Sequence, residues 1–382
     1  MQLFVLGADH RCASLSELGR ARLLRESIEA RLIDLCRNGA SAGAVLIDTC
    51  NRFEVLFEIE HADAAAALRK GVRQTLGDLP LRELRDLSAV EHLIRVTTGL
   101  ESLVPGEEQI LGQVTRAFRA AEEVGLSSRR LHSLGSRITA VARMLRGRKP
   151  DQRVPRSVAD LAARVAREHG ARVAVVGAGA MARAAAEELR RLDVEELWLV
   201  NRTVARAEAL ARHFGGRAQS LDEFLVDPPR VEVVILALAG RELALPHARL
   251  SHLRSVVDIS QPTVLHPETR ERTDLAVLDL IGLGAHAQVA CQDLGRWIED
   301  SRELAHGHAR RLWIEVSGDR TDLQHLVNLH VDAAREEMEK ARRNGLAQLP
   351  PEQMDAVAKL VERVARRNAH LHVKDLRHLE PA

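Results

Sequence analysis

Apolar and polar positions in the first part of the chain alternate between strand and helix patterns. Residues 2–7 and 44–48 are short apolar runs that predict strands, and residues 15–39 between them repeat apolar side chains at helical spacing. After an interruption by glycine and proline, a further helix is predicted over about 109–124. These elements predict an α+β domain over residues 1–145.

A charged, proline-containing stretch at 146–157 reads as a linker, and the pattern changes after it. A helix is predicted up to His169, and buried strands such as "RVAVV", "LWLV" and "VEVVIL" then alternate with helices. Strands separated by helices of ten or more residues indicate a parallel sheet with crossover connections. We therefore predict a compact α/β domain over residues 157–285.

The last region, residues 286–382, is almost wholly helical in pattern. Its first helix is expected to be long enough to project from a globular domain. Long amphipathic helices usually bury their apolar stripes against one another or against a second subunit, so a homodimer is predicted. The apolar positions that suggest it are Leu326, Leu329, Val331, Val357, Leu360 and Val364.

Composition narrows the class of protein. The formal net charge is only +1, which argues against a generally basic nucleic-acid-binding coat, and the chain has nine aromatic residues and no Tyr. Four cysteines without a C-x-x-C spacing indicate neither a zinc site nor a disulfide framework, as in a reduced, cytoplasmic protein. A basic leader and an apolar run near the roughly 20 residues of a membrane span are both absent from the sequence.

The stretch "VAVVGAGAMA" has the pattern of a dinucleotide-binding turn. Gly177 allows the turn after the strand, Gly179 lets a pyrophosphate approach the helix N-terminus, and Ala182 permits close helix packing. After the second strand, where an NAD enzyme normally has an acidic residue, the sequence reads "NRT", which favours the 2′-phosphate of NADPH. The expected cofactor-binding residues are Gly177, Ala178, Gly179, Ala180, Met181, Ala182, Asn201, Arg202 and Thr203.

A cysteine beside a cation stands out in "DTCNRFEVLFEI", residues 48–59. Cys50 is either a small buried side chain or a nucleophile whose thiolate is stabilised by Arg52. A nucleophilic thiol and a nicotinamide domain in one chain suggest that an activated acyl group is captured as a thioester and then reduced to an aldehyde.

Four stretches together carry a family resemblance: "TCNRFEVL", "GLESLVPGEEQILGQVTRAF", "GAGAMA" with "NRT", and "VVDISQP". In order and spacing they resemble glutamyl-tRNA reductases, and "ADHRCAS" is similar to the N-terminal motif of that family. The resemblance spans essentially the whole chain. It implies a multidomain α/β protein: an N-terminal α+β catalytic domain that binds glutamyl-tRNA, a Rossmann-type NADPH domain, and a long spinal helix leading to a helical dimerisation domain.

The resemblance also implies roles for individual residues. Cys50 would be the nucleophile, His92 a residue needed for activity, and Arg52 the partner of the substrate γ-carboxylate. The remaining expected substrate-binding residues are Thr49, Asn51, Ser102, Glu107, Glu108, Gln109 and Gln113. The implied reaction makes glutamate-1-semialdehyde, the entry to tetrapyrrole (haem) synthesis. Glutamate-1-semialdehyde aminomutase is then an expected partner, and no metal is required.

Departures from the family pattern, among them the following two, keep two other functions open. Asp48 stands where serine is usual, and the strand end that normally carries hydroxyl side chains facing the nicotinamide reads "LALAG" at 236–240. One alternative is a divergent paralogue that makes a different product from glutamyl-tRNA. The other is a non-catalytic protein that binds tRNA or a partner of the haem pathway.

Overall fold

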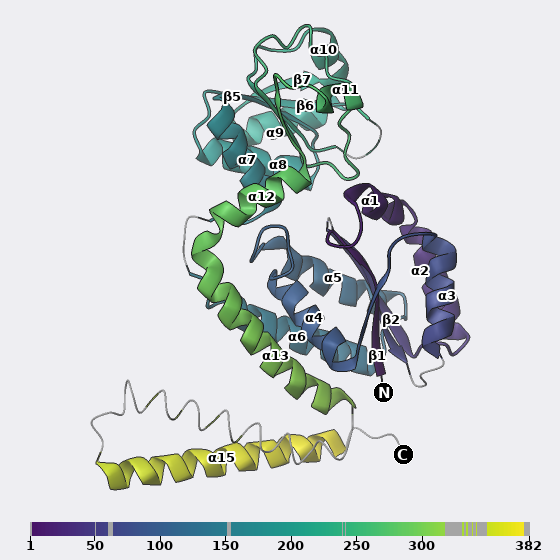
Figure 1. Cartoon of the computed structure of the whole chain (residues 1–382), viewed down its shortest axis with the longest axis vertical. Helices are drawn as coiled ribbons and strands as arrows, with labels where there is room; N and C mark the ends of the chain where they lie inside the picture. The colour runs from purple at the N-terminus through teal and green to yellow at the C-terminus, as the bar shows by residue number, and fades with distance from the viewer. Residues whose placement is uncertain are drawn as a thin grey trace.

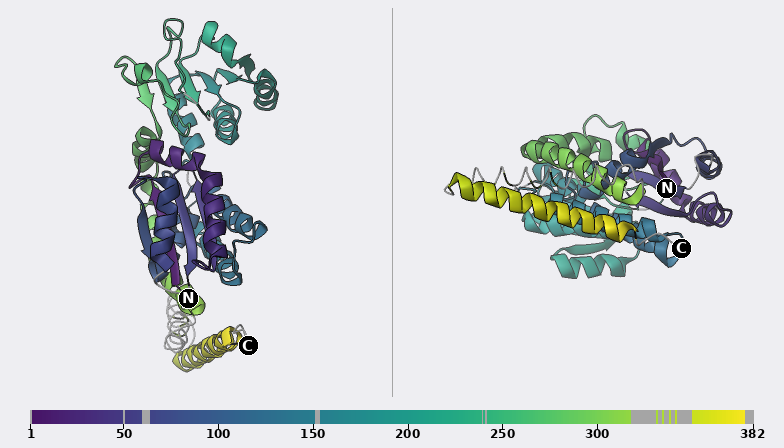
Figure 2. Two further views of the ribbon diagram at one scale, coloured as in Figure 1. Left: turned by 90° about the vertical axis from the view of Figure 1, so that its right-hand side faces the viewer. Right: turned by 90° about the horizontal axis from the view of Figure 1, so that it is seen from below.

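The structure is a computed structural model of the chain. It describes residues 2–49, 51–59, 64–150, 154–238, 240, 242–317, 331, 334, 338, 341 and 350–377. Two domains are stacked end to end, and a long helix runs from the second domain along the first (Figures 1 and 2). The helix α15 (Pro351–Arg377) lies beyond the other end of the first domain.

The first domain is built on a four-stranded antiparallel sheet in the order β2-β3-β1-β4. Its strands are β1 (Gln2–Asp9), β2 (Gly43–Thr49), β3 (Arg52–Ile59) and β4 (Arg82–Arg85). β1 and β3 are buried along nearly their whole length. Helices on both faces explain this burial, because each side chain of a strand, whichever way it points, meets apolar cover.

One face of this sheet is covered by α2 (Arg25–Arg37) and α3 (Ala64–Leu76), as Figure 1 shows. The other face carries α4 (Asp86–Thr98), α5 (Gln109–Glu123) and α6 (Arg129–Arg146). The short helix α1 (Leu15–Leu23) precedes α2, and a break at Leu24 separates them. The single helical pattern predicted over 15–39 is therefore two helices.

The second domain has a six-stranded parallel sheet in the order β10-β9-β8-β5-β6-β7. Its strands are β5 (Arg172–Val176), β6 (Glu196–Asn201), β7 (Arg217–Ser220), β8 (Val233–Leu236), β9 (Ser255–Asp258) and β10 (Ala276–Leu278). Its helices are α7 (Val158–His169), α8 (Ala180–Arg191), α9 (Val204–Phe214), α10 (Leu221–Val226), α11 (Pro267–Arg270) and α12 (Leu280–Ala290). The strand order reverses between β5 and β8, which is where such sheets bind their ligands.

The long helix differs from its prediction in two ways. It is interrupted after α12 by a short 3-10 turn, η1 (Gln292–Leu294), and continues as α13 (Gly295–Ser317). α13 does not project freely, because it packs on α4 and α6 of the first domain. Trp297 is buried there, and its indole Nε1 donates to the Leu145 carbonyl at 3.1 Å. The domain boundaries at 145, 157 and 285 stay predictions.

Candidate functional site

The predicted nucleophile falls in the sequence between the end of β2 and the start of β3. Cys50 itself lies outside the described residues, but both of its neighbours, Thr49 and Asn51, are buried. The register of the sheet sets β1 beside β3, with Asp9 opposite Arg52, and the His10 amide donates to the Asn51 carbonyl at 2.9 Å. The end of β1 therefore supports the backbone on one side of position 50.

Arg52 is held inside the domain rather than at its surface. Its side chain is 1% exposed, one guanidinium nitrogen lies 3.3 Å from the Glu54 carboxylate, and the other donates to the Glu101 carbonyl at 2.9 Å. The Nε atom has no partner among the described residues. A buried guanidinium retaining a free donor is suited to a carboxylate ligand, and its predicted role in substrate binding stays a prediction.

His92 is brought to the same cluster by α4. Its Nε2 lies 2.9 and 3.0 Å from the two oxygens of the Glu54 carboxylate, and both residues are buried. Burial raises the pKa of Glu54, but the charges of His92 and Arg52 outweigh it and lower the pKa to about 2. Glu54 is therefore ionised across the physiological pH range, and its carboxylate fixes the ring of His92.

The segment from Gly99 to Gln109 closes the cluster from the far side. Gly99 adopts φ +87° after α4 and allows the sharp return of the chain. Arg146 donates to the Glu107 carbonyl at 2.6 Å, and the Glu108 amide donates to the Arg156 carbonyl at 3.0 Å. The other residues predicted here, Ser102, Gln109 and Gln113, are half-buried.

Glu107 is a buried acid whose pKa is close to neutral pH. Glu107 is only 3% exposed. This burial raises the pKa of its carboxyl group to about 7 despite the positive charges of Arg146 and Arg52. Near neutral pH this carboxyl group therefore keeps its proton more readily than an exposed glutamate does. It can therefore donate a hydrogen bond to a ligand as well as accept one.

Replacing Glu107 by glutamine should change the pH dependence of stability. A folded pKa of about 7, above the ordinary 4.5, means that the wild type loses stability as pH rises from about 4.5 to 7. Glutamine does not ionise and should not show this loss. The unfolding free energy of Glu107→Gln, measured relative to wild type, should therefore be roughly 1–3 kcal/mol larger at pH 8 than at pH 5. Urea unfolding of both proteins at both pH values measures this. A difference between the two proteins that stays constant with pH would contradict the burial of this carboxyl group.

Several residues of this cluster were not predicted from the sequence. Asp9 is fully buried and accepts hydrogen bonds from the Arg11 amide at 3.0 Å and from the Arg11 guanidinium at 3.1 Å. Burial works against the charge, but these bonds hold the pKa of Asp9 well below its usual range. Arg11 also pairs with the Glu101 carboxylate. The "ADHR" stretch was the available signal, and only the strand register shows that it meets Arg52.

The predicted dinucleotide turn forms at the switch point of the parallel sheet. Gly177 has φ +132°, and a Cβ there would lie 2.2 Å from the Ala237 carbonyl oxygen, so only glycine fits. Gly179 is the N-cap of α8, and a Cβ added there would meet no atom within 4 Å. Ala182 is fully buried beneath the turn. The first glycine thus shapes the turn, and the second leaves open space at the helix N-terminus.

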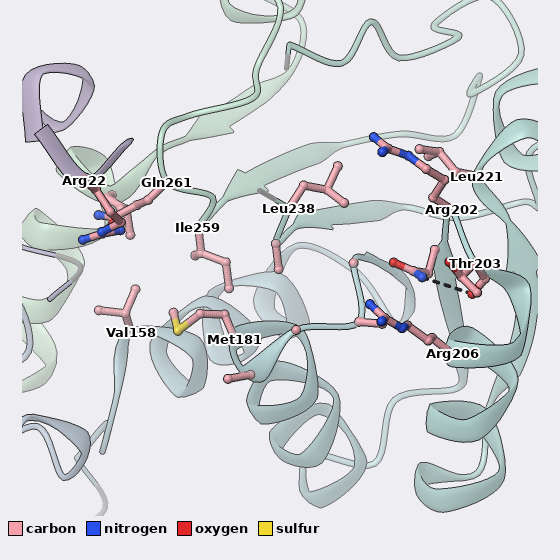
Figure 3. A pocket seen from close by; sticks show the side chains of 17 residues that line it. Arg22, Val158, Met181, Arg202, Thr203, Arg206, Leu221, Leu238, Ile259 and Gln261 are labelled. Atoms are coloured by element: carbon pink, nitrogen blue, oxygen red, sulfur yellow. Dashed lines mark hydrogen bonds between the residues drawn. The ribbon is translucent and has the colours of Figure 1, made fainter. Parts of the chain in front are cut away.

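This turn opens into a cavity of about 520 Å³. Figure 3 shows Arg202, Thr203 and Arg206 at one end, Met181 and Leu238 along the middle, and Gln261 with Arg22 at the other end. The side-chain amide nitrogen of Asn201 donates to the Thr203 backbone carbonyl at 3.0 Å. All the predicted cofactor-binding residues except Ala182 line the cavity. Arg206 and Arg22 were not predicted, because neither belongs to the glycine motif or to "NRT".

The size, shape and donors of the cavity suit a dinucleotide. Glycine amides at a helix N-terminus suit a pyrophosphate, and the cations after β6 suit a 2′-phosphate. In the described part of the chain, no three His, Cys, Asp or Glu side chains are grouped so as to hold a metal ion. None of the described helices is long and apolar enough to cross a membrane.

Comparison with known families matches both domains. The model of the glutamyl-tRNA(Glu) reductase N-terminal domain matches residues 6–148, and that of shikimate/quinate 5-dehydrogenase matches residues 160–284. A glutamyl-tRNA reductase from Stenotrophomonas maltophilia is 39% identical over 249 residues, which cover 63% of this chain. This chain spans only 58% of the length of that relative.

Two further relatives cover more of the protein. A glutamyl-tRNA reductase from Deinococcus radiodurans is 33% identical over 281 residues, 70% of this chain and 79% of that protein. The solved structure of glutamyl-tRNA reductase from Methanopyrus kandleri has a TM-score of 0.50 at 25% identity, and the alignment covers 96% of this chain and 99% of that one. The predicted fold class is confirmed, and the chain belongs to the glutamyl-tRNA reductase family.

Proposed function

We propose that this chain is an NADPH-dependent glutamyl-tRNA reductase, which converts glutamyl-tRNA(Glu) to glutamate-1-semialdehyde in the first step of C5 tetrapyrrole synthesis. The observation that carries the proposal is the pairing, in one chain, of two sites. One is the buried Arg52–Glu54–His92 cluster next to position 50, and the other is a dinucleotide cavity with cations at one end. Family membership supports the same assignment.

The chemistry divides between the two domains. The Cys50 thiolate would attack the carbonyl carbon of the aminoacyl ester, the C–O bond to the tRNA ribose would break, and the released ribose oxygen would take a proton. Bound NADPH would supply a hydride to the thioester carbonyl carbon. Collapse of the resulting thiohemiacetal would break the C–S bond, restore the thiolate and release the aldehyde with the proton balance closed by solvent.

Residues around Cys50 have separate tasks in this proposal. Arg52, with its unused Nε donor, would bind the γ-carboxylate of the glutamyl group. Glu54 holds both Arg52 and His92 and would act as a positioning residue for them. Thr49, Asn51 and the Ser102–Gln113 segment would supply the remaining polar contacts to the substrate.

The experiment that tests the proposal is detection of the acyl-enzyme. When glutamyl-tRNA is added without NADPH, mass spectrometry of the digested protein should find a glutamyl group on the Cys50 peptide. The label should disappear when NADPH is added before the quench. Absence of any acyl label, with glutamyl-tRNA intact, would refute the thioester route.

An altered product remains a second candidate because of one observation. Ala237 and Leu238 line the cavity with apolar side chains, at the strand end where the family usually places hydroxyl groups. A divergent paralogue could bind the cofactor and yet fail to transfer hydride. Free glutamate as the sole product in saturating NADPH would favour this candidate.

The proposal includes a homodimer formed by the C-terminal helices. Of the apolar positions that predict it, Leu326 and Leu329 lie outside the described residues and Val331 is buried. Leu360 and Val364, one helical turn apart on α15, are 53% and 48% exposed. An exposed apolar stripe on a helix is suited to cover by a second copy.

Light scattering tests the dimer. The wild-type chain should have the mass of two copies at low micromolar concentration, and replacing both Leu360 and Val364 by glutamate should shift it toward one copy. Desolvating two charges in an apolar interface is strongly unfavourable. A wild-type protein that is monomeric under these conditions would rule the dimer out.

A further inference from the structure

The first domain contributes a side chain to the nucleotide cavity of the second. Arg22, near the C-terminal end of α1, lines the cavity together with Gln261 from the loop after β9 (Figure 3). The approach of the two elements is close, because a Cβ added at Gly19 would lie 2.9 Å from the Pro262 Cβ. Gly19 therefore lets α1 rest directly on this loop.

Arg22 uses its guanidinium group to join three partners. Its Nε donates to the Asp48 carboxylate at 2.9 Å, and one terminal nitrogen donates to the Gln261 side-chain oxygen at 2.8 Å. The other terminal nitrogen donates to the Thr49 carbonyl. Asp48 also pairs with Arg25 at 3.3 Å. The backbone immediately before Cys50 is thereby tied to the wall of the nucleotide cavity.

The contact with Arg22 also fixes which way the Gln261 amide faces. A guanidinium group has donors only, so the amide atom that it meets must be the oxygen. The amide nitrogen, Nε2, is then directed away from Arg22. That nitrogen is buried and has no hydrogen-bond partner among the described residues. A buried donor without an acceptor is unfavourable, and it often marks the place of a ligand atom.

Gln261 lies at the end of the cavity that is left for the nicotinamide. The opposite end holds Arg202 and Arg206, which suit the 2′-phosphate of the adenosine half, and the glycine turn between the ends suits the pyrophosphate. The remaining half of the ligand must then extend toward Ile259, Gln261 and Arg22. This is also the end that faces the first domain, where the thioester would form.

We infer that Gln261 is a cofactor-binding residue that donates a hydrogen bond from Nε2 to an oxygen of the nicotinamide-riboside half of NADPH, and that Arg22 is the positioning residue that orients it. The inference rests on the proposed function. It gives the nicotinamide end a polar anchor where the "LALAG" strand end has none, since Ala237 and Leu238 carry no side-chain donor. The nearby Ser260 does not line the cavity, and its hydroxyl accepts from the Leu238 amide at 3.0 Å.

Binding measurements with the whole chain distinguish contacts to the nicotinamide half of the ligand from contacts to the adenosine half. The probes are NADPH and adenosine 2′,5′-bisphosphate, which lacks the nicotinamide riboside. Gln261→Leu should weaken NADPH binding about tenfold, the effect expected for one lost hydrogen bond, and should leave the bisphosphate within about twofold of wild type. Gln261→Glu keeps an oxygen for Arg22 but replaces the donor by an acceptor, so it should weaken NADPH binding at least as much.

Two further variants complete the test. Arg22→Met should weaken the binding of NADPH and not that of the bisphosphate. The double variant Arg22→Met/Gln261→Leu should weaken NADPH binding by less than the sum of the two single effects, because both substitutions remove the same oriented donor. Arg202→Met is the matched control at the other end of the cavity, and it should weaken the binding of both probes. Equal NADPH affinity for wild type and both Gln261 variants would overturn the inference, as would equal weakening of both probes by them. A wild-type chain that binds neither probe would instead overturn the proposed function.

Discussion

Replacement of Cys50 by serine is expected to abolish aldehyde formation, by roughly a thousandfold or more, while glutamyl-tRNA binding survives. In the proposed mechanism a cysteine thiolate attacks the ester, whereas a serine hydroxyl without an adjacent base does not. Aldehyde trapping measures the rate, and a filter-binding assay with labelled glutamyl-tRNA measures the affinity.

Cys36 provides the matched control for this substitution. It is a half-buried thiol on α2, and burial raises its pKa. Cys36→Ser should therefore keep the activity of the wild type, because this thiol stays protonated and α2 covers the face of the sheet opposite to α4, which carries His92. Retention of aldehyde formation by Cys50→Ser would remove Cys50 from the mechanism.

A valine at position 179 is expected to prevent NADPH binding without unfolding the protein. An added Cβ at Gly179 meets no protein atom within 4 Å, and the backbone there has φ −78°, which valine can adopt. The branched side chain would instead fill the space at the start of α8 that a pyrophosphate needs. Losing several backbone hydrogen bonds together should weaken NADPH binding by roughly a hundredfold or more.

The neighbouring glycine gives the contrasting result. Valine at Gly177 would have φ +132° and a Cβ 2.2 Å from the Ala237 carbonyl, so this variant should be strongly destabilised. Thermal unfolding and NADPH titration of both variants separate the two roles. A Gly179→Val protein that binds NADPH as the wild type does would show that this turn does not hold the cofactor.

Local patterns predicted the nucleotide domain well. The strand that ends at Val176, the turn and α8 follow one another within twenty residues, and their periodicity and glycines define them without reference to the rest of the chain. The break between α1 and α2 at Leu24 was missed because no glycine or proline marks it. Leu24 leaves the helical conformation with φ −93° and ψ 10°, and apolar periodicity does not record such a change in one residue.

The Arg52–Glu54–His92 cluster depends on contacts between residues that are distant in the sequence. Glu54 meets His92 because α4 covers one face of the sheet that contains β3, and Asp9 stands opposite Arg52 because of the register of β1 and β3. Arg52 and His92 were predicted, whereas Asp9 and Glu54 read in the sequence as ordinary charged residues. The bond from Arg22 to Gln261 joins residues of different domains, so it follows from how the domains are placed and not from any motif.

Product analysis in a single turnover tests the central claim most directly, namely that one chain captures the glutamyl group and then reduces it. Glutamyl-tRNA carrying labelled glutamate is mixed with excess protein, with or without saturating NADPH, and the label is followed into aldehyde and free glutamate. We expect aldehyde as the main product with NADPH, and slow release of glutamate without it as water hydrolyses the thioester. Glutamate as the main product in both reactions, or label that stays on the tRNA in both, would contradict the account.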